Sequence, residues 1–504
     1  MSDFPYPGLR PYKRDEIDIF FGREEHTDLL VKHLKDTHFL AVVGPSGCGK
    51  SSLVRTGLLA ALETGFMASA GGSWRIAELR PGNCPFARLA EAFLDEHILD
   101  NHKVTIEFSQ AIALLQASLQ RGPHSVHELL AATPLPDNTT LLLLIDQFEE
   151  IFRYFQHGDK NEATAFVKLL LASCTHPAVY VVITMRSDFI GDGATFYGLP
   201  EAINQGLFLT PRLTRTQLRE AIELPAAVFG GEVEPNLVNH LLNEVGTDSD
   251  KLPQLQHVLM RIWQLAHFEN PNRAILTLTH YKQIGGLENA LSQHVDKAYT
   301  ELEPEQQKIA EILFRSLSER SQKYRDTRRP VELSEVAKLA NVSWQQVATC
   351  AEVFRKPGRS FLMPPLDTAL TPDTVLDISH ESLIQRWHRL KKWTGIEAKS
   401  ANMYRRLEET ALLNAKGKAE LWKGLDLENA LDWLRRENPT PIWAKRYGKN
   451  EDQYFDQSMR FLTQSEKRQQ HEAQEKETAR QRQLQRARQQ VIIAISGLII
   501  MFGL

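Results

Sequence analysis

The stretch GPSGCGKSS at residues 44–52 is the feature that most constrains what this chain folds into. It follows an apolar run at residues 38–43 and precedes residues 53–60, which are typical of a helix. The stretch fits G-x-x-x-x-G-K-[ST], in which glycines let backbone N–H groups approach phosphate oxygens and the following helix offers its positive end. Because strand, loop and helix come in the order that this pattern requires, we predict an α/β fold that binds a nucleotide.

Every residue of this loop is expected to lie against the nucleotide. The Lys50 ammonium would reach the β- and γ-phosphates, and the Ser51 hydroxyl would be a ligand of Mg²⁺. The predicted nucleotide contacts are Gly44, Pro45, Ser46, Gly47, Cys48, Gly49, Lys50, Ser51 and Ser52. A nucleotide together with Mg²⁺ is therefore the predicted cofactor.

A second strand is predicted to carry the acid that such a loop requires. Residues 140–145 form an unbroken apolar run, which is typical of a central strand buried on both faces, and Asp146 follows directly. The carboxyl end of such a strand is where ligands bind in open α/β sheets. We expect Asp146 to hold Mg²⁺ through water, which would neutralise charge that develops on the phosphoryl group.

Three more strands complete the predicted sheet. They are residues 74–79, 178–184 and 207–209. Arg186 follows the second of them and would face the γ-phosphate. A capping box at Thr214 and Gln217 predicts that a helix begins after the last strand. Residues 20–226 therefore read as a five-stranded, mostly parallel sheet between helices, the arrangement of an α/β P-loop NTPase.

Six sequence blocks together resemble a known family. They are PYPGLRPYKRDEIDIFFGRE, GPSGCGKSSLVRTGLL, LLLLIDQFEEIF, ITMRSDF, KLPQLQHVL and ISHESLIQRW, and they span residues 5 to about 390 in this order. This series resembles the bacterial STAND NTPases, specifically the novel STAND NTPase 1 branch. The resemblance implies an AAA+/STAND-like fold in a signal-transduction ATPase that holds ADP at rest and exchanges it for ATP when a sensor is triggered.

The same resemblance implies three further nucleotide contacts. Arg23 resembles the arginine of a G-R-E element on the adenine and ribose side. Pro253 resembles the proline of a helical lid that packs on the base, although Lys251 stands where shorter relatives often have glycine. His380, within Ser379-His380-Glu381, resembles the M-H-D histidine that contacts the ADP β-phosphate.

Residues 305–395 have the pattern of a winged helix, with helices at 306–319, 334–340 and 343–354 and a two-stranded wing at 359–363 and 374–378. Such domains usually bind DNA through the second helix of the helix-turn-helix. Here that helix, SWQQVATCAEVF, has no basic residue before Arg355. The sequence therefore disfavours DNA as a partner, and an ATP-controlled winged-helix transcription regulator is the alternative function.

The residues after Asp146 predict slow turnover. Fast-turning relatives of this fold have a glutamate next, which orients the attacking water, whereas this chain has Gln147. A catalytic base must come within hydrogen-bond reach of its water. Glu149 and Glu150 are both candidates for that role, and the sequence does not distinguish them. A constitutive ATPase machine is disfavoured for the same reason.

The last hundred residues change in character. Tryptophans and leucines recur at helical spacing up to residue 461, residues 465–490 are rich in charge, and residues 491–504 are almost wholly apolar. As a helix this last segment would rise about 21 Å, short of the roughly 30 Å hydrocarbon core. Four arginines precede this segment. We therefore expect that it is the start of a transmembrane helix of a longer chain, which would anchor the protein at the inner face of the membrane.

The predicted domains follow from these boundaries. They are a lead-in at 1–20, the nucleotide-binding domain at 21–226, a helical lid at 227–304, the winged helix at 305–395, a helical region at 396–464, a charged linker helix at 465–490 and the apolar segment at 491–504.

Composition limits location and partners. The net charge of −4 gives no global basic field for nucleic acid, and four scattered cysteines without metal or redox spacing favour a reducing cytoplasm. The N-terminus lacks a signal-peptide pattern. We therefore predict a cytoplasmic ATP/ADP switch that hydrolyses ATP slowly. Its predicted partners are sensor or effector domains after residue 504 or in other chains, and further copies of itself on activation.

Overall fold

The computed structural model describes residues 4–67, 70–95, 98, 107–246, 248, 251–319, 327–449 and 452–502. The chain divides into two compact units. The first unit comprises Met1–Glu301, Glu352–Thr368 and Ile378–Trp387, and the second comprises Leu302–Ala351, Ala369–Asp377 and His388–Leu504. The segment around His380 therefore belongs to the same unit as the phosphate loop.

The first unit is built on a five-stranded parallel sheet in the order β2-β3-β4-β1-β5. Its strands are β1 (Phe39–Gly44), β2 (Ser73–Leu79), β3 (Thr139–Ile145), β4 (Val179–Arg186) and β5 (Leu207–Leu209). Every residue of β1, β3 and β4 is buried, as unbroken apolar runs predict. The five predicted strands and the α/β fold are confirmed. The carboxyl ends of the strands meet at one edge, where the phosphate loop lies.

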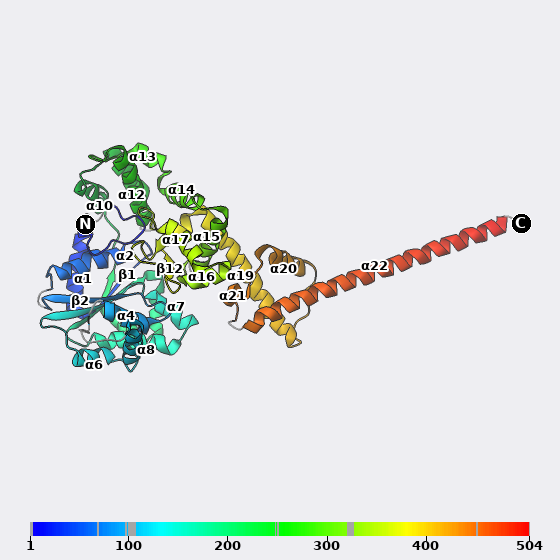
Figure 1. Cartoon of the computed structure of the whole chain (residues 1–504), viewed down its shortest axis with the longest axis horizontal. Helices are drawn as coiled ribbons and strands as arrows, with labels where there is room; N and C mark the ends of the chain where they lie inside the picture. Colours follow the sequence, from blue (N-terminus) through cyan, green and yellow to red (C-terminus); the bar gives the residue numbers. More distant parts are fainter. Residues whose placement is uncertain are drawn as a thin grey trace. The chain divides into compact units, whose positions relative to one another are not determined.

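Helices surround this sheet, with α1, α4 and α8 beside it (Figure 1). The elements are η1 (Ile17–Ile19), α1 (Glu24–Thr37), α2 (Lys50–Ser52), η2 (Leu53–Leu59), α3 (Ala60–Glu63), α4 (Pro85–Asp95), α5 (Phe108–Leu119), α6 (Ser125–Ala132), α7 (Glu149–His157), α8 (Lys160–Ser173), η3 (Ser187–Thr195) and α9 (Leu199–Gln205). A helix was predicted directly after the phosphate loop, and η2 gives that segment a π-helical turn. Such turns are frequent at functional sites.

A mainly helical region follows the sheet within the first unit. It contains α10 (Arg215–Val228), β6 (Glu232–Val233), α11 (Pro235–Val245), α12 (Leu252–Glu269), β7 (Ile275–Leu276), α13 (Leu278–Gln283) and α14 (Gly286–Thr300). These helices share one apolar core, which also includes Tyr6 from the N-terminal segment. The predicted capping box is confirmed, because Thr214 Oγ1 accepts from Gln217 N and Gln217 Oε1 accepts from Thr214 N.

Two short elements complete the first unit. They are β11 (Leu362–Met363) and α18 (Ser382–Arg386). Between them, Ser379 N donates to Phe361 O at 3.0 Å. This backbone contact fixes the chain just before His380, at the beginning of α18.

The second unit is largely helical. Its elements are α15 (Pro304–Ser316), β8 (Ser318–Glu319), β9 (Thr327–Arg328), β10 (Val331–Glu332), α16 (Leu333–Ala340), α17 (Trp344–Arg355, whose last turn belongs to the first unit), β12 (Val375–Ile378), α19 (His388–Ala415), α20 (Gly424–Glu437), α21 (Pro441–Lys445) and α22 (Asp452–Phe502). Helix α16, the turn at Asn341 and helix α17 lie where the helix-turn-helix was predicted. The winged helix itself stays a prediction.

The C-terminal helix α22 differs along its length. Phe461 and Leu462 are buried in a core with α19 and α20, whereas the side chains described from 473 to 495 are exposed. Within the described residues, no helix is both long and apolar enough to cross a membrane. Of the apolar segment predicted at 491–504, the structure describes helix up to Phe502.

Candidate nucleotide site

The phosphate loop joins β1 to α2 and has the conformation that its glycines permit. Gly47 and Gly49 have φ of 79° and 93°, in the left-handed region that side chains disfavour. The Lys50 side chain is buried and lies back across the loop, since Nζ donates to Gly44 O at 3.0 Å and to Pro45 O at 2.8 Å. Carbonyl groups of the phosphate loop therefore hold the Lys50 ammonium.

Arg23 is buried beneath this loop. Its guanidinium donates to Cys48 O at 2.9 Å and to Pro211 O at 2.7 Å. Burial lowers the pKa of Arg23 to about 10. In the structure this side chain thus braces the backbone of the phosphate loop, and its predicted contact with adenine and ribose stays a prediction.

Asp146 follows β3 and lies beside the start of the loop helix. Its Oδ1 accepts from Ser51 Oγ at 2.7 Å and from Thr184 Oγ1 at 2.6 Å, and its Oδ2 lies 3.2 Å from Arg55 Nη2 and 3.6 Å from Arg80 Nε. Burial raises the pKa of this carboxyl, but the two arginines and the two hydroxyl donors outweigh burial and hold the pKa well below its usual value. Asp146 is therefore a carboxylate at neutral pH.

Ser51 and Asp146 suit a magnesium ion. A hydroxyl that donates to a carboxylate keeps lone pairs for a metal, and Mg²⁺ prefers oxygen ligands and takes substrate phosphates as others. Among the described residues no group of three or more His, Cys, Asp or Glu could hold a metal. In sites of this kind Mg²⁺ usually keeps several waters and takes further ligands from substrate phosphates.

The two candidate bases have different surroundings. Glu149 is buried, and its Oε2 accepts from Arg186 N at 3.3 Å. Burial raises its pKa, against the opposing charges of Lys50, Arg153 and Arg186. Glu150 instead accepts from Gly82 N at 3.0 Å through Oε2. The Lys50 charge thus acts on the pKa of Glu149, whose carboxylate also accepts from the backbone of Arg186.

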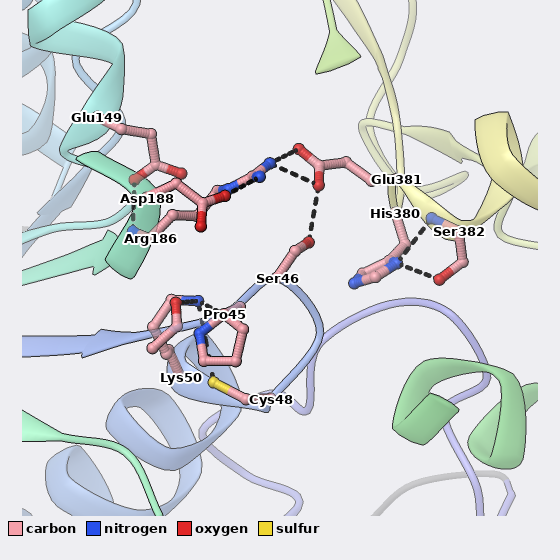
Figure 2. Close-up of polar contacts among 11 residues, drawn as sticks. Pro45, Ser46, Cys48, Lys50, Glu149, Arg186, Asp188, His380, Glu381 and Ser382 are labelled. Atoms are coloured by element: carbon pink, nitrogen blue, oxygen red, sulfur yellow. Dashed lines mark hydrogen bonds and ion pairs between the residues drawn. The ribbon is translucent and has the colours of Figure 1, made fainter. Parts of the chain in front are cut away.

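Arg186, at the end of β4, is held by an acid that sequence reasoning did not assign. Its Nη1 donates to both carboxylate oxygens of Glu381 at 2.8 Å, and its Nη2 donates to Asp188 at 2.6 Å. Glu381 Oε2 also accepts from Ser46 Oγ in the phosphate loop at 2.7 Å. Figure 2 shows the Glu381 carboxylate between the Arg186 guanidinium and Ser46. Glu381 therefore links the loop to the arginine predicted to face the γ-phosphate.

His380 and Pro253 converge on Gly47 of the loop. A Cβ placed on Gly47 would lie 3.1 Å from Pro253 Cγ and 3.5 Å from His380 Cε1. His380 Nδ1 accepts from Ser382 N at 3.1 Å and lies 2.9 Å from Ser382 Oγ. Because a backbone N–H can only donate, the neutral ring carries its proton on Nε2. Three segments far apart in the sequence thus meet at this glycine.

Sequence reasoning missed Glu381, Arg55 and Arg80. Glu381 stands next to His380 in the quoted block ISHESLIQRW, and Arg80 directly follows strand β2, so their positions were available signals. Arg55 lies one helical turn after the phosphate loop. The role of each residue becomes visible only in its contact with Asp146 or Arg186, which lies far away in the sequence.

Comparisons with known proteins agree with this geometry. The sequence model of the novel STAND NTPase 1 family matches residues 5–419. A search of curated protein sequences returned no significant match.

Solved structures give more distant similarities. The Walker-type ATPase PABY2304 of Pyrococcus abyssi is 11% identical with a TM-score of 0.35, over 75% of this chain and 98% of that chain. The Aeropyrum pernix ORC2 protein in its ADPNP–ADP complexes is 13% identical with a TM-score of 0.38, over 78% of this chain and 97% of that chain. Drosophila ORC bound to DNA is 16% identical with a TM-score of 0.31, over 74% of this chain and 85% of that chain.

At these identities and TM-scores, the solved structures support no inference about what this chain binds. The assignment instead rests on the family match, which covers most of the chain, together with the parallel sheet and the phosphate loop. The chain belongs to the novel STAND NTPase 1 family and is an ATP-binding P-loop NTPase.

Proposed function

We propose that this protein is a signalling switch that holds ADP at rest, exchanges it for ATP when triggered, and hydrolyses ATP slowly to reset. The observation that carries this proposal is the position of Glu381. Both of its carboxylate oxygens accept from Arg186 Nη1, and one of them also accepts a hydrogen bond from Ser46. A carboxylate here competes with a γ-phosphate for the same donors, because both are anions with several acceptor oxygens.

This competition favours a diphosphate. With ADP bound, Arg186 keeps its pair with Glu381. With ATP bound, the γ-phosphate adds negative charge near Glu381, and Arg186 must be shared or the Glu381 segment must move. Removing one partner of a buried ion pair is costly, since the other charge is left uncompensated. The Glu381–Arg186 pair thus opposes ATP until another interaction moves the segment.

His380 would report the diphosphate from the same segment. Its neutral ring carries a proton on Nε2, and its Cε1 lies close to Gly47. A ring nitrogen with a proton can donate to a β-phosphate oxygen. Lys50 would bind the β- and γ-phosphates after leaving the loop carbonyls that it contacts. Ser51 and Asp146 would hold Mg²⁺, which when bound would neutralise negative charge on the nucleotide phosphates.

Slow hydrolysis would follow from the residues after Asp146. Gln147 has φ of 58°, and its backbone N donates to Thr184 Oγ1 at 3.0 Å. Its side chain is neutral, whereas fast-turning relatives of this fold have a glutamate at this position that orients the attacking water. Glu149 remains to orient the water. Burial raises the pKa of Glu149 toward that of a useful base.

The proposed partners are sensor or effector modules in other domains or chains, and copies of this chain on activation. The alternative, a DNA-binding regulator, gains nothing from helix α17. Arg355, the first basic residue of this helix, is buried, and its guanidinium donates to the carbonyls of Pro364, Pro365 and Thr368. It is thus engaged within the fold.

The test is to denature the purified protein and identify the nucleotide released, for the parent and for His380→Ala. We expect ADP at near one equivalent in the parent and at least a fivefold lower amount in the variant. Ser343→Ala, at an exposed residue outside the site, is the matched control and should retain ADP. An empty site in parent and variant alike would overturn the proposal.

A further inference from the structure

The carboxylate of Asp146 has a partner for each oxygen before any metal is considered. Two hydroxyls donate to Oδ1, whereas two guanidinium groups lie at Oδ2, those of Arg55 at 3.2 Å and Arg80 at 3.6 Å. The Asp146 side chain is 1% exposed. Two guanidinium groups therefore lie at one oxygen of this buried carboxylate.

The two arginines come from different elements. Arg55 lies on η2, one turn after the loop, and also pairs with Glu78 of β2. Its pKa is raised, because the charges of Asp146 and Glu78 outweigh the burial that would lower it. Arg80 follows the end of β2, and its side chain is 31% exposed. Arg55 is thus shared with a second acid, while Arg80 approaches Asp146 from the more open side.

We propose that Arg55 and Arg80 stand in for Mg²⁺ at Asp146, so that this protein holds ADP without a metal and needs Mg²⁺ only for ATP. The inference rests on the proposed function and assigns the metal dependence of its two states. Cations close to a carboxylate offset its charge and repel another cation, and this effect is strongest where water is excluded.

The triphosphate changes this balance. ATP carries one more phosphate group than ADP, so it would offer a Mg²⁺ ion held by Ser51 and Asp146 a further anionic ligand. Only with that ligand does binding of the ion outweigh repulsion by Arg55 and Arg80. The more exposed Arg80 has room to turn toward solvent when the ion enters.

The test measures release of a fluorescent ADP analogue and a fluorescent ATP analogue by stopped flow, in excess Mg²⁺ and in EDTA. For the parent, we expect EDTA to change the ADP release rate by less than twofold and to speed ATP release at least tenfold. Arg80→Gln removes one stand-in charge, and EDTA should then speed ADP release at least fivefold. Arg80→Lys retains the charge and should behave as the parent.

The outcomes separate this inference from the proposed function. If the parent binds ADP but releases it at least tenfold faster in EDTA, metal-independent retention is wrong while the ADP switch stands. If Arg80→Gln and Arg80→Lys both release ADP as the parent does, Arg80 is not the stand-in. Arg55→Gln, with thermal melting to check folding, then tests the other cation, and an unchanged response would overturn the proposal. If neither analogue binds the parent, the proposed function fails first.

Discussion

Glu149 and Glu150 are adjacent in the chain, yet their carboxylates have different surroundings. Glu149 lies at the buried end of β4, where it accepts from Arg186 N, and Glu150 accepts from Gly82 N on the β2–α4 loop. Helix α7 begins at Glu149, and neighbouring helical side chains point in different directions. One residue can therefore serve the site while the next fixes a loop.

We expect Glu149→Gln to slow ATP hydrolysis about 100-fold, the usual contribution of a positioned base. Glu150→Gln should change the rate less than threefold. The measurement is single-turnover hydrolysis with enzyme in excess, which isolates the chemical step from nucleotide exchange. Equal losses in the two variants would refute the assignment of Glu149.

At the scale of elements, two buried histidines join α12 to α14. His257 Nε2 lies 3.0 Å from His294 Nδ1, and Arg261 Nη1 lies 3.3 Å from His294 Nε2. Burial, with the charge of Arg261, lowers the pKa of His257 to about 3. Burial and the neighbouring charges of His257, Arg261 and Arg359 also hold the pKa of His294 well below its usual value. The helices thus pack across a pair of neutral rings.

This packing predicts that stability falls in acid. Below about pH 6.5 the unfolded chain takes up a proton on His257, whereas the folded chain does so only near pH 3. Stability is therefore lost as pH falls through this window, by about 2 kcal/mol from His257 at pH 5. Urea unfolding at pH 7 and pH 5 measures the loss. His257→Phe should reduce it, and His267→Asn, at an exposed residue of the same helix, should leave it unchanged.

The N-terminal segment ties the helical region to the phosphate loop. Tyr6 OH donates to Ile222 O at 2.5 Å within the core of that region. Tyr12 OH donates to Gln256 Oε1 at 3.2 Å on α12, while Tyr12 N donates to Ser52 Oγ at 3.2 Å, at the end of the GPSGCGKSS stretch. Residues predicted only as a lead-in therefore connect two parts of the first unit.

We expect Tyr6→Phe to lower the free energy of unfolding of this unit by about 1–2 kcal/mol, because Ile222 O would lose its buried partner. Tyr197→Phe is the matched control, since Tyr197 is 92% exposed. Denaturant unfolding followed by fluorescence measures both. A Tyr6→Phe variant as stable as Tyr197→Phe would contradict this role of the segment.

At the scale of the whole molecule, local patterns predicted the sheet and the loop but not the closing contacts of the site. The five strands are recognisable because buried strands read as continuous apolar runs. The Glu381–Arg186 pair joins residues 195 positions apart, and no spacing rule reaches so far. Arg23 is expected at the nucleotide, but its contacts with the carbonyls of Cys48 and Pro211 could not be predicted, because a buried guanidinium takes whatever acceptors surround it.

The two parts of α22 should contribute very differently to stability. Phe461 lies in the core of the second unit with its ring 5.7 Å from that of Trp422, whereas residues 476–493 are exposed. We expect Phe461→Ala to cost about 3 kcal/mol, since it leaves a cavity. Removing residues 476–504 should shift the melting temperature by less than about 1 °C. Calorimetry of both variants measures this, and a large shift on truncation would show that the exposed part packs on the fold.

The central claim is that Glu381 holds Arg186 away from a γ-phosphate. Its most direct test is the ratio of ADP to ATP affinity, measured by competition with a fluorescent ADP analogue, for the parent, Glu381→Gln and Asp188→Asn. Asp188 pairs with the same arginine without contacting the loop serine, and its side chain is 49% exposed. We predict that the parent prefers ADP at least tenfold, that Glu381→Gln loses most of this preference, and that Asp188→Asn keeps it. An unchanged preference in Glu381→Gln would contradict the account.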